Sequence, residues 1–302
     1  KWKCIPHEVK VGHKRVRYST SKDALNLILQ DDIEDHIRQY ITKLLEYRRD
    51  SKLDSVYVRG MNRYLRPGGL IHASWNLTGA KTGRDSCNDP NLQQIPRKGD
   101  IKELFISRFR KGVLSGIDVN QSELRIAAHE SNEGRMIELF NSQDADIHRA
   151  IAATILNKPI AKVTDDERYA AKQVDFLVLY GGGIQTLIQE ISEQTKLTRD
   201  EALSIIKKWH KTFPGWREHE NKIREKVLKD HYVRNLFGRY RRLLIIDPDS
   251  EKGKKQVRQA INSPIQGGSI DYLRLCGVEL RKRLIKAKLN ERCLITCSVH
   301  DQ

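Results

Sequence analysis

Four side chains suited to a phosphorylated ligand recur at every fourth position of one short stretch. The stretch ERYAAKQVDFLVLYGGG (167–183) contains Arg168, Lys172, Phe176 and Tyr180. Four residues advance about 400° around an α-helix, so these side chains would form one slowly turning stripe. Two cations near a helix N-terminus favour a multiply charged anion such as a triphosphate, and an aromatic ring farther along can stack on a base. A solvated basic face that runs into core aromatics is the alternative interpretation.

Two aspartates at the ends of apolar segments are candidate ligands for divalent cations. Asp118 follows GVLSGI, and Asp301 follows CLITCSVH. Enzymes of phosphoryl transfer often hold two divalent cations about 3.5–4 Å apart between such carboxylates. Either aspartate alone is also a common turn former. The pair therefore indicates two-metal chemistry only in combination with the cationic stripe and the net charge.

The helix that must carry the stripe has recognisable start and stop signals. The sequence Thr164-Asp165-Asp166-Glu167 has the form of a capping box, which predicts a helix that begins near Asp165. The glycines at 181–183 predict its end, with Gly181 in the left-handed cap position.

The other elements follow from apolar periodicity and turn residues. Strands are predicted over 112–119 and 293–302, each ending at or near one of the two aspartates. Helices are predicted within 22–50, from Ser122, over most of 135–232 and over 256–286 as one or two helices joined near Pro264–Gly268, with a turn at Gly238. A sheet built from distant segments with a helical insert between them is an α+β fold with an inserted domain.

Charge and composition narrow the class of protein. The 302 residues include 55 Lys and Arg against 39 Asp and Glu, a formal net charge of +16. Such a balance favours a polyanionic partner, with nucleic acid the leading candidate. Five scattered cysteines do not form a disulfide framework and indicate a reducing compartment. The chain has no apolar run that would span a membrane, so we expect no membrane partner.

Five segments together resemble the family A DNA polymerases, the bacterial DNA polymerase I type. The segment DVNQSELRIAAHES (118–131) is similar to motif A, RYAAKQVDFLVLYGGG (168–183) to motif B, and VHDQ (299–302) to motif C. The segment TGRDSCNDPNLQQIPR (82–97) resembles the template–primer segment, and INSPIQGGSIDYLRL (261–275) the stretch before motif C. The order and spacing of these segments agree with the family pattern from about residue 20 to the end. A phage or a bacterium is the expected source.

The resemblance implies roles for the residues of the two carboxylate segments and the stripe. Asp118 and Asp301 would be the catalytic, metal-binding carboxylates, with the Val119 carbonyl as a further ligand of two Mg²⁺ ions. The residues implied to bind the incoming deoxynucleoside triphosphate are His148, Arg168 and Lys172 at the phosphates, Phe176 and Tyr180 at sugar and base, Gln121 as support and Glu123 as the steric gate against a 2′-hydroxyl. The residues implied to contact primer, template or the nascent pair are Arg84, Asn91, Gln94, Arg258, Asn262, Gln266 and His300.

The resemblance also implies the fold, the activity and the partners. The fold would be a polymerase right hand, with an antiparallel palm sheet, a largely helical fingers insertion and a partial thumb. The implied boundaries are 1–58 for the thumb remnant, 59–132 for palm, 133–262 for fingers and 263–302 for palm. We expect a DNA-directed DNA polymerase that acts on primer–template DNA. Its expected location is the cytoplasm of a bacterium or phage-infected cell, and location in an organelle is an open alternative.

The sequence departs from the family pattern at motif C. The family usually has Glu after the motif C aspartate, whereas this chain has Gln302. The sequence stops there, while motif C of the family is a hairpin with a return strand. We therefore expect a complementing carboxyl-terminal fragment from a second polypeptide or an interrupted gene. No 3′–5′ exonuclease segment is recognisable, so proofreading is not expected of these residues.

Two alternative functions stay open at this point. A phage-type single-subunit RNA polymerase shares the two carboxylates and a related helix, but Glu123 and the 82–97 segment argue against it. A non-catalytic DNA-binding chain, or the inactive half of a split polymerase, is favoured by Gln302 and disfavoured by Asp118, Arg168 and Lys172.

Overall fold

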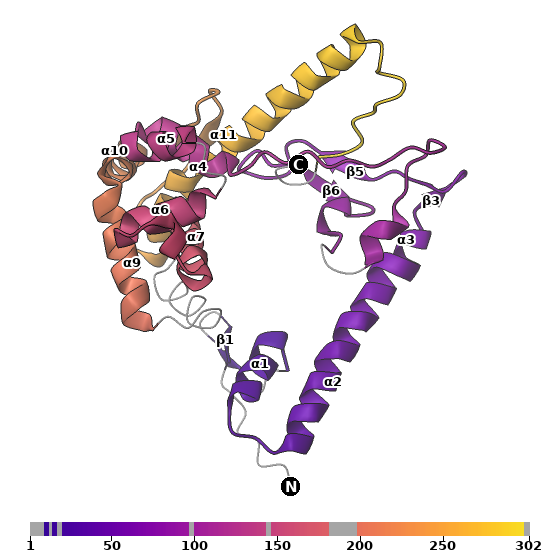
Figure 1. Cartoon of the computed structure of the whole chain (residues 1–302), viewed down its shortest axis with the longest axis horizontal. Helices are drawn as coiled ribbons and strands as arrows, with labels where there is room; N and C mark the ends of the chain where they lie inside the picture. The colour runs from indigo at the N-terminus through magenta and orange to yellow at the C-terminus, as the bar shows by residue number, and fades with distance from the viewer. Residues whose placement is uncertain are drawn as a thin grey trace. The chain divides into compact units, whose positions relative to one another are not determined.

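The chain divides by compactness into two units, which are described separately. The computed structural model describes residues 9–11, 14–16, 20–96, 100–142, 146–180 and 198–298. The first unit comprises residues 1–74 and 87–114, and the second comprises residues 75–86 and 115–302 (Figure 1). The predicted boundaries of thumb, palm and fingers stay a prediction.

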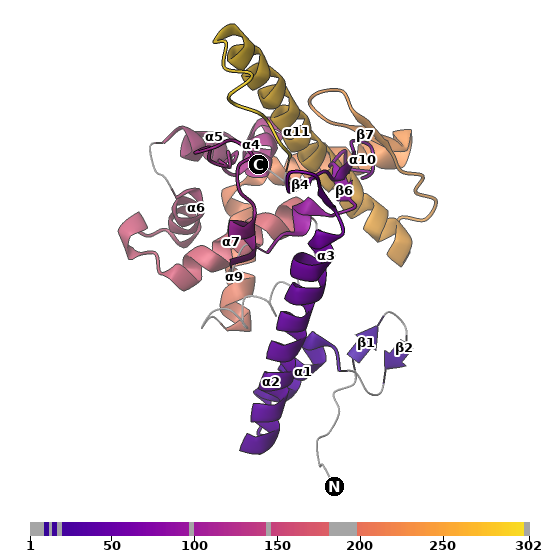
Figure 2. The same cartoon turned by 90° about the vertical axis from the view of Figure 1, so that its right-hand side faces the viewer.

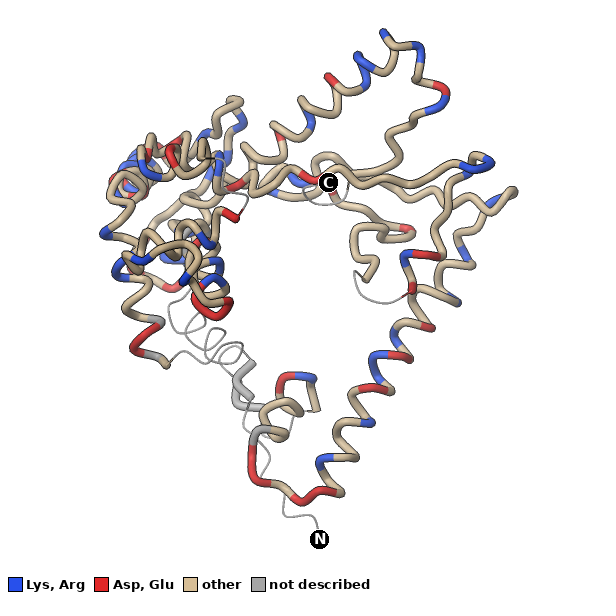
Figure 3. The backbone as a smooth tube through the Cα atoms, in the orientation of Figure 1, with Lys and Arg blue, Asp and Glu red and all other residues tan. Residues whose placement is uncertain are grey.

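The first unit contains one continuous helical column. Its second helix passes through a π-helical turn directly into a short third helix (Figure 2), and acidic and basic side chains are interspersed along it (Figure 3). Ile37 and Ile41 of this column pack with Leu25 in a small buried cluster. The elements are β1 (Val9–Val11), β2 (Lys14–Val16), α1 (Lys22–Gln30), α2 (Asp35–Lys52), the π-turn Leu53–Val58, α3 (Arg59–Asn62), β3 (Leu65–Arg66), β4 (Leu70–Ile71) and the 3-10 turns Leu92–Gln94 and Asp100–Leu104.

The second unit is a helical assembly around one large core. Each of its main helices contributes a side chain that is at most 2% exposed: Leu124, Val174, Trp209, Trp216 and Ile265. The elements are α4 (Ser122–Ser131), α5 (Gly134–Asn141), α6 (Ile147–Leu156), the 3-10 turn Ile160–Lys162, α7 (Asp165–Tyr180), α9 (Arg199–Thr212), α10 (Pro214–Asp230), β7 (Tyr232–Arg234), β8 (Tyr240–Arg242) and α11 (Glu251–Lys286). The short strands β5 (Ser74–Asn76) and β6 (Ser86–Asn88) lie where the two units divide.

The predicted start of the stripe-bearing helix is confirmed. α7 begins at Asp165, and the Thr164 hydroxyl accepts a hydrogen bond from the Glu167 N–H (3.2 Å). The Glu167 carboxylate in turn accepts one from the Thr164 N–H (2.9 Å), which completes the capping box. The glycines at 181–183, which were predicted to end the helix, lie outside the described residues.

The region before motif C forms one helix. α11 runs from Glu251 to Lys286 with Pro264 inside it, so no joint divides it near Pro264–Gly268. Pro264 has no N–H to donate to the carbonyl of Ala260 four residues earlier. Burial of Ala260, Pro264 and Ile265 against the core stabilises the helix across this lost hydrogen bond. The turn predicted at Gly238 is confirmed: it joins β7 and β8, with φ +88° at that glycine.

The strands predicted over 112–119 and 293–302 are wrong for the residues described, whereas the antiparallel palm sheet as such stays a prediction. The segments 112–119 and 293–298 contain no strand, and Val113 and Ile117 are 81% and 67% exposed. The strands that are described form pairs of two or three residues each, so these two segments lack the ladder partners that would bury their apolar side chains. The described fold is mostly helical with small antiparallel sheets.

Cys87, Cys276, Cys293 and Cys297 are free thiols, while Cys4 lies outside the described part. Within the ranges described above, every helix falls short of the length and apolar character that a bilayer crossing requires.

Truncation of the second unit's core should cost much more stability than the same change on its surface. Leu124 is 2% exposed, so Leu124→Ala should lower the free energy of unfolding by about 2–5 kcal/mol, through lost burial and a residual cavity. Leu244, which is 64% exposed, is the matched control, and Leu244→Ala should change it by less than about 0.5 kcal/mol. Urea unfolding followed by circular dichroism measures both, and equal losses would contradict this core assignment.

Candidate active site

The start of α4 brings the motif A residues to the side of α11. Gln121 adopts a left-handed conformation (φ 53°) and forms the N-cap of α4. Ser122, directly after it, is buried and shares a hydrogen bond of 2.5 Å with the hydroxyl of Ser269 on α11. This contact fixes the α4 N-terminus, and with it Val119 and Glu123, against the middle of α11.

Four of the predicted site residues line one small pocket. Arg84, Val119, Glu123 and Gln266 line it, and its other lining residues are Ser122, Ser269, Ile270 and Leu273. An Nη of Arg84 donates to Oε1 of Glu123 at 2.7 Å, and the Glu123 side chain is only 8% exposed. The predicted steric gate and a predicted primer contact therefore form one ion pair at the edge of the pocket.

The cations of the α7 stripe are half-buried and have partners. Nε of Arg168 donates to the carboxylate of Asp146, the N-cap residue of α6. Burial raises the pKa of Asp146, but the bond from Arg168, the Arg149 N–H and the nearby positive charges together keep that pKa below its ordinary value. Nζ of Lys172 lies 6.0 Å from the ring centroid of Phe176, within the range of a cation–π contact. The backbone of Tyr180 ends α7, and its side chain is outside the described part.

A buried carboxylate that the sequence reasoning missed adjoins this stripe. Asp175 is fully buried, and its Oδ2 lies 2.7 Å from Nδ1 of His148 on α6. Its Oδ1 accepts a hydrogen bond from the indole N–H of Trp209 on α9 (2.8 Å). The signal in the sequence was a single carboxylate within the apolar run Val174–Leu179, where a helix facing a core would otherwise be uncharged.

Three of the predicted DNA contacts share one face of α11. Arg258, Asn262 and Gln266 follow one another at intervals of four residues, so they form a stripe along the helix. Arg258 is exposed, whereas Oδ1 of Asn262 is buried and has no hydrogen-bond partner within the described residues. Gln266, at the end of the stripe, reaches the pocket beside Glu123.

The other predicted DNA contacts lie elsewhere in the chain. Asn91 and Gln94 belong to the first unit, where Asn91 caps a 3-10 turn and the Gln94 carbonyl accepts a hydrogen bond from the Tyr57 hydroxyl (2.6 Å). His300 lies outside the described residues.

The predicted metal ligands are only partly described. Asp118 is exposed and directly precedes Val119 of the pocket, whereas Asp301 lies outside the described residues. Across the described ranges, no group of three or more His, Cys, Asp or Glu side chains is arranged to hold a metal ion. The convergence of Asp118 and Asp301 therefore stays a prediction.

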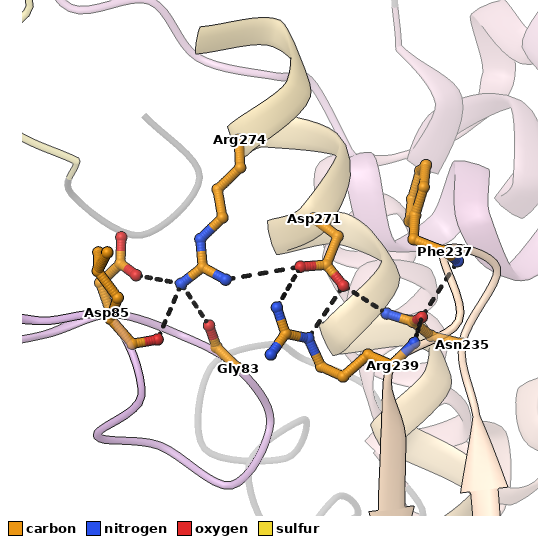
Figure 4. Close-up of polar contacts among 8 residues, drawn as sticks. Gly83, Asp85, Asn235, Phe237, Arg239, Asp271 and Arg274 are labelled. Atoms are coloured by element: carbon orange, nitrogen blue, oxygen red, sulfur yellow. Dashed lines mark hydrogen bonds and ion pairs between the residues drawn. The ribbon is translucent and has the colours of Figure 1, made fainter. Parts of the chain in front are cut away.

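An ion-pair network holds the loop that carries Arg84 (Figure 4). Asp271 of α11 accepts two hydrogen bonds from Arg239, at 2.6 and 3.0 Å, and one from the Asn235 side chain at 2.8 Å. Arg274, one turn further on, donates to the Gly83 carbonyl (2.9 Å) and to the Asp85 carboxylate. Arg84 is thus flanked on both sides by residues that are tied to α11.

Close packing around Gly83 also holds the loop that carries Arg84. Gly83 has φ +88°, and a Cβ at this position would come within 2.9 Å of Nε of Arg239. A larger residue would be strained by its backbone conformation and would push against the guanidinium that pairs with Asp271.

Neutralising Asp271 should loosen this loop. Burial raises the pKa of Asp271, but hydrogen bonds from Arg239 and Asn235 bring it below its ordinary value. Because its partners are partly exposed, Asp271→Asn should lower the free energy of unfolding by about 1–3 kcal/mol at pH 7. This difference should persist above the ordinary aspartate pKa of about 4 and disappear as pH falls through the lower folded value.

The control for this prediction is an exposed ion pair on the same helix. Glu279 pairs with Arg283 at 3.0 Å, with side chains 52% and 76% exposed. Glu279→Gln should change the unfolding free energy by less than about 0.5 kcal/mol at any pH. Urea unfolding at several pH values measures both variants, and a loss for Asp271→Asn that does not exceed this control would contradict the role of the network.

Comparison with known proteins relates these features to a family. Residues 3–302 match DNA polymerase family A. The DNA polymerase of Bacillus phage SP01 is 32% identical over 275 residues, which are 87% of this chain and 29% of that protein. DNA polymerase I of Streptococcus pneumoniae is 32% identical over 298 residues, 94% of this chain and 32% of that protein.

A solved structure is similar over the same part of the chain. The POL domain of Pol1 from M. smegmatis, in complex with DNA primer-template and dNTP, is 28% identical with a TM-score of 0.77, over 94% of this chain and 49% of that one. The chain thus spans about a third of the length of the curated relatives it matches. Since the family match extends over nearly every residue, the chain belongs to DNA polymerase family A.

Proposed function

We propose that the chain carries out template-directed DNA synthesis, adding deoxynucleotides to a primer 3′-hydroxyl with release of pyrophosphate. The observation that best supports this is the pocket between α4 and α11, which gathers Arg84, Val119, Glu123 and Gln266 from three separate motifs. The M. smegmatis relative was solved with primer-template and dNTP, the ligands proposed here for this chain. The cytoplasm of a bacterium or phage-infected cell remains the expected location.

The triphosphate would bind along α7 and α6. Arg168 and Lys172 supply positive charge on one face of α7, and His148 projects from the adjacent α6. The Arg168 guanidinium bonds to Asp146, so an incoming phosphate would take the place of that carboxylate. A triphosphate accepts from the same N–H donors and carries more negative charge in total than one carboxylate.

The metal ligands that the sequence predicts fit Mg²⁺ chemically. Asp118 is exposed and is followed by the Val119 main-chain carbonyl, and both offer the hard oxygen donors that Mg²⁺ prefers. Asp301 would complete the set. These residues would hold two Mg²⁺ ions, and the chemistry supplied there would be a lower pKa of the primer hydroxyl and neutralised charge on the leaving phosphates.

Selection of the sugar would rest on Glu123. Its carboxylate is buried and paired with Arg84, so the pocket wall at this point is held in place. A ribonucleotide would bring its 2′-hydroxyl against this wall, where it would clash or remain unpaired in a desolvated site. Deoxynucleotides are therefore the proposed substrates.

Part of the contact to primer and template would come from α11. Arg258, Asn262 and Gln266 form a polar stripe on α11. The remaining basic residues would bind the duplex backbone without reading sequence, which gives binding that weakens steeply with salt.

Primer extension tests the proposal. The chain should extend a labelled primer with Mg²⁺ and dNTPs but not with rNTPs. Asp118→Asn should lower the rate at least about 100-fold, because a metal-binding carboxylate is lost. Asp249→Asn, at an exposed turn, is the matched control and should retain the wild-type rate.

Two outcomes would overturn this function. DNA binding without extension would select the non-catalytic alternative, and preferential use of rNTPs would select an RNA polymerase.

Because residue 176 is a phenylalanine, we expect the chain to incorporate dideoxynucleotides poorly. Its ring lies beside Lys172 and carries no hydroxyl to replace a missing 3′-hydroxyl. Phe176→Tyr should therefore raise the dideoxy-to-deoxy ratio of kcat/KM on the order of 10-fold, the effect of one charge-assisted hydrogen bond. The same change at Phe109, in the first unit, is the control and should leave the ratio unchanged. An unaltered ratio in Phe176→Tyr would rule out this placement of the ring.

A further inference from the structure

A buried carboxylate ties together three helices beside the proposed triphosphate site. Asp175 on α7 is fully buried, and each of its oxygens has a nitrogen partner on a different helix. Oδ2 lies 2.7 Å from Nδ1 of His148 on α6, and Oδ1 accepts from Nε1 of Trp209 on α9 at 2.8 Å. His148 is itself only 5% exposed, so water does not replace these contacts.

The arrangement determines which nitrogen of His148 a ligand can meet. The indole N–H of Trp209 is only a donor, so Oδ1 of Asp175 must accept. The remaining oxygen then shares a proton with Nδ1 of His148, and this proton fixes the ring orientation. Nδ1 is thereby engaged inside the core, and Nε2 is the nitrogen left to face a ligand.

The contacts of Asp175 act on its charge in opposite directions. Burial raises the pKa of Asp175 above its ordinary value, and the hydrogen bonds with His148 and Trp209 oppose this rise without cancelling it. A phosphate oxygen can only accept, so its contact with Nε2 would require a proton on that nitrogen as well as on Nδ1, and that hydrogen bond would be charge-assisted.

We infer that Asp175 is a positioning residue for nucleotide binding: it holds His148 with Nδ1 turned inward and Nε2 presented to the triphosphate, and Trp209 holds Asp175 in turn. Asp175 does not touch the nucleotide itself. The inference rests on the proposed function, because it assigns Asp175 a role through a residue expected to contact the incoming nucleotide.

The position requires a carboxylate rather than a side chain of the same shape. In Asp175→Asn, the amide oxygen would be drawn to the Trp209 N–H, and the amide NH₂ would face Nδ1 of His148. Two donors cannot bond to each other, so Nδ1 must give up its proton. The ring would then carry its single proton on Nε2, and the doubly protonated form would be disfavoured.

Imidazole nitrogen chemical shifts test this step without any catalysis. With ¹⁵N-labelled histidine, Nδ1 of His148 should be protonated in the wild type and unprotonated in Asp175→Asn at neutral pH. Trp209→Phe should keep Nδ1 protonated, because it leaves the His148–Asp175 contact in place. Asp200→Asn, an exposed change in the first turn of α9, is the control for the labelling and the fold. An unprotonated Nδ1 in the wild type, or the same tautomer in wild type and Asp175→Asn, would overturn the inference.

A double-mutant cycle tests the link to the nucleotide. The probe is the Mg²⁺ complex of dGTP, bound to the chain with primer–template DNA under conditions without turnover. Asp175→Asn should weaken its binding about 10-fold in the wild-type background and less than about 2-fold in a His148→Ala background. A purely structural role for Asp175 would give the same loss in both backgrounds, and that result would overturn the inference.

These readouts separate this inference from the proposed function. If primers are not extended but dGTP binding depends on Asp175 only when His148 is present, the proposed function fails and the positioning role stands. If extension occurs and the cycle is additive, synthesis stands and the positioning role fails.

Discussion

The packing of α7 against its neighbours fixes the positions of Arg168 and Lys172, the side chains proposed to bind phosphate. Val174, Asp175 and Leu179 of this helix are buried in the core, while Arg168 and Lys172, nearer its N-terminus, are half-buried. The helix contacts α4, α6, α9 and α11, so its rotation about its own axis is fixed by four partners. A rotation by one residue, about 100°, would take Asp175 away from His148 on α6 and Trp209 on α9. The location of the cationic stripe is thus a consequence of core packing rather than of local charge.

Buried and half-buried acids are the second constraint on the unit, and three of them have well-defined donors. Glu123 pairs with Arg84, Asp271 accepts from Arg239 and Asn235, and Asp175 accepts from Trp209. Since a buried carboxylate without donors would be strongly destabilising, these contacts also fix the elements that supply the donors. The loop of Arg84, the β7–β8 hairpin and α9 are held to the helical core in this way.

The sequence reasoning succeeded where the signal is local. The capping box at Thr164 and Glu167 depends on four consecutive residues, and the four-residue spacing from Arg168 to Phe176 depends on one helix. It failed for the strand at 112–119, because an apolar run predicts burial only if other segments supply hydrogen-bond partners. It also missed the role of Asp175, since its partners His148 and Trp209 are 27 and 34 residues away and only the folded core brings them together.

The bond between Arg168 and Asp146 would make capture of the proposed triphosphate an exchange of anions. The pKa of Asp146 is held below its ordinary value, so at neutral pH the guanidinium contacts an ionised carboxylate. A solute with a single charge, such as chloride or acetate, would gain little by displacing a tethered group of the same valence. A polyphosphate would interact through several charges at once and could displace it. The Asp146 carboxylate would therefore select against small ions by valence, without any steric barrier.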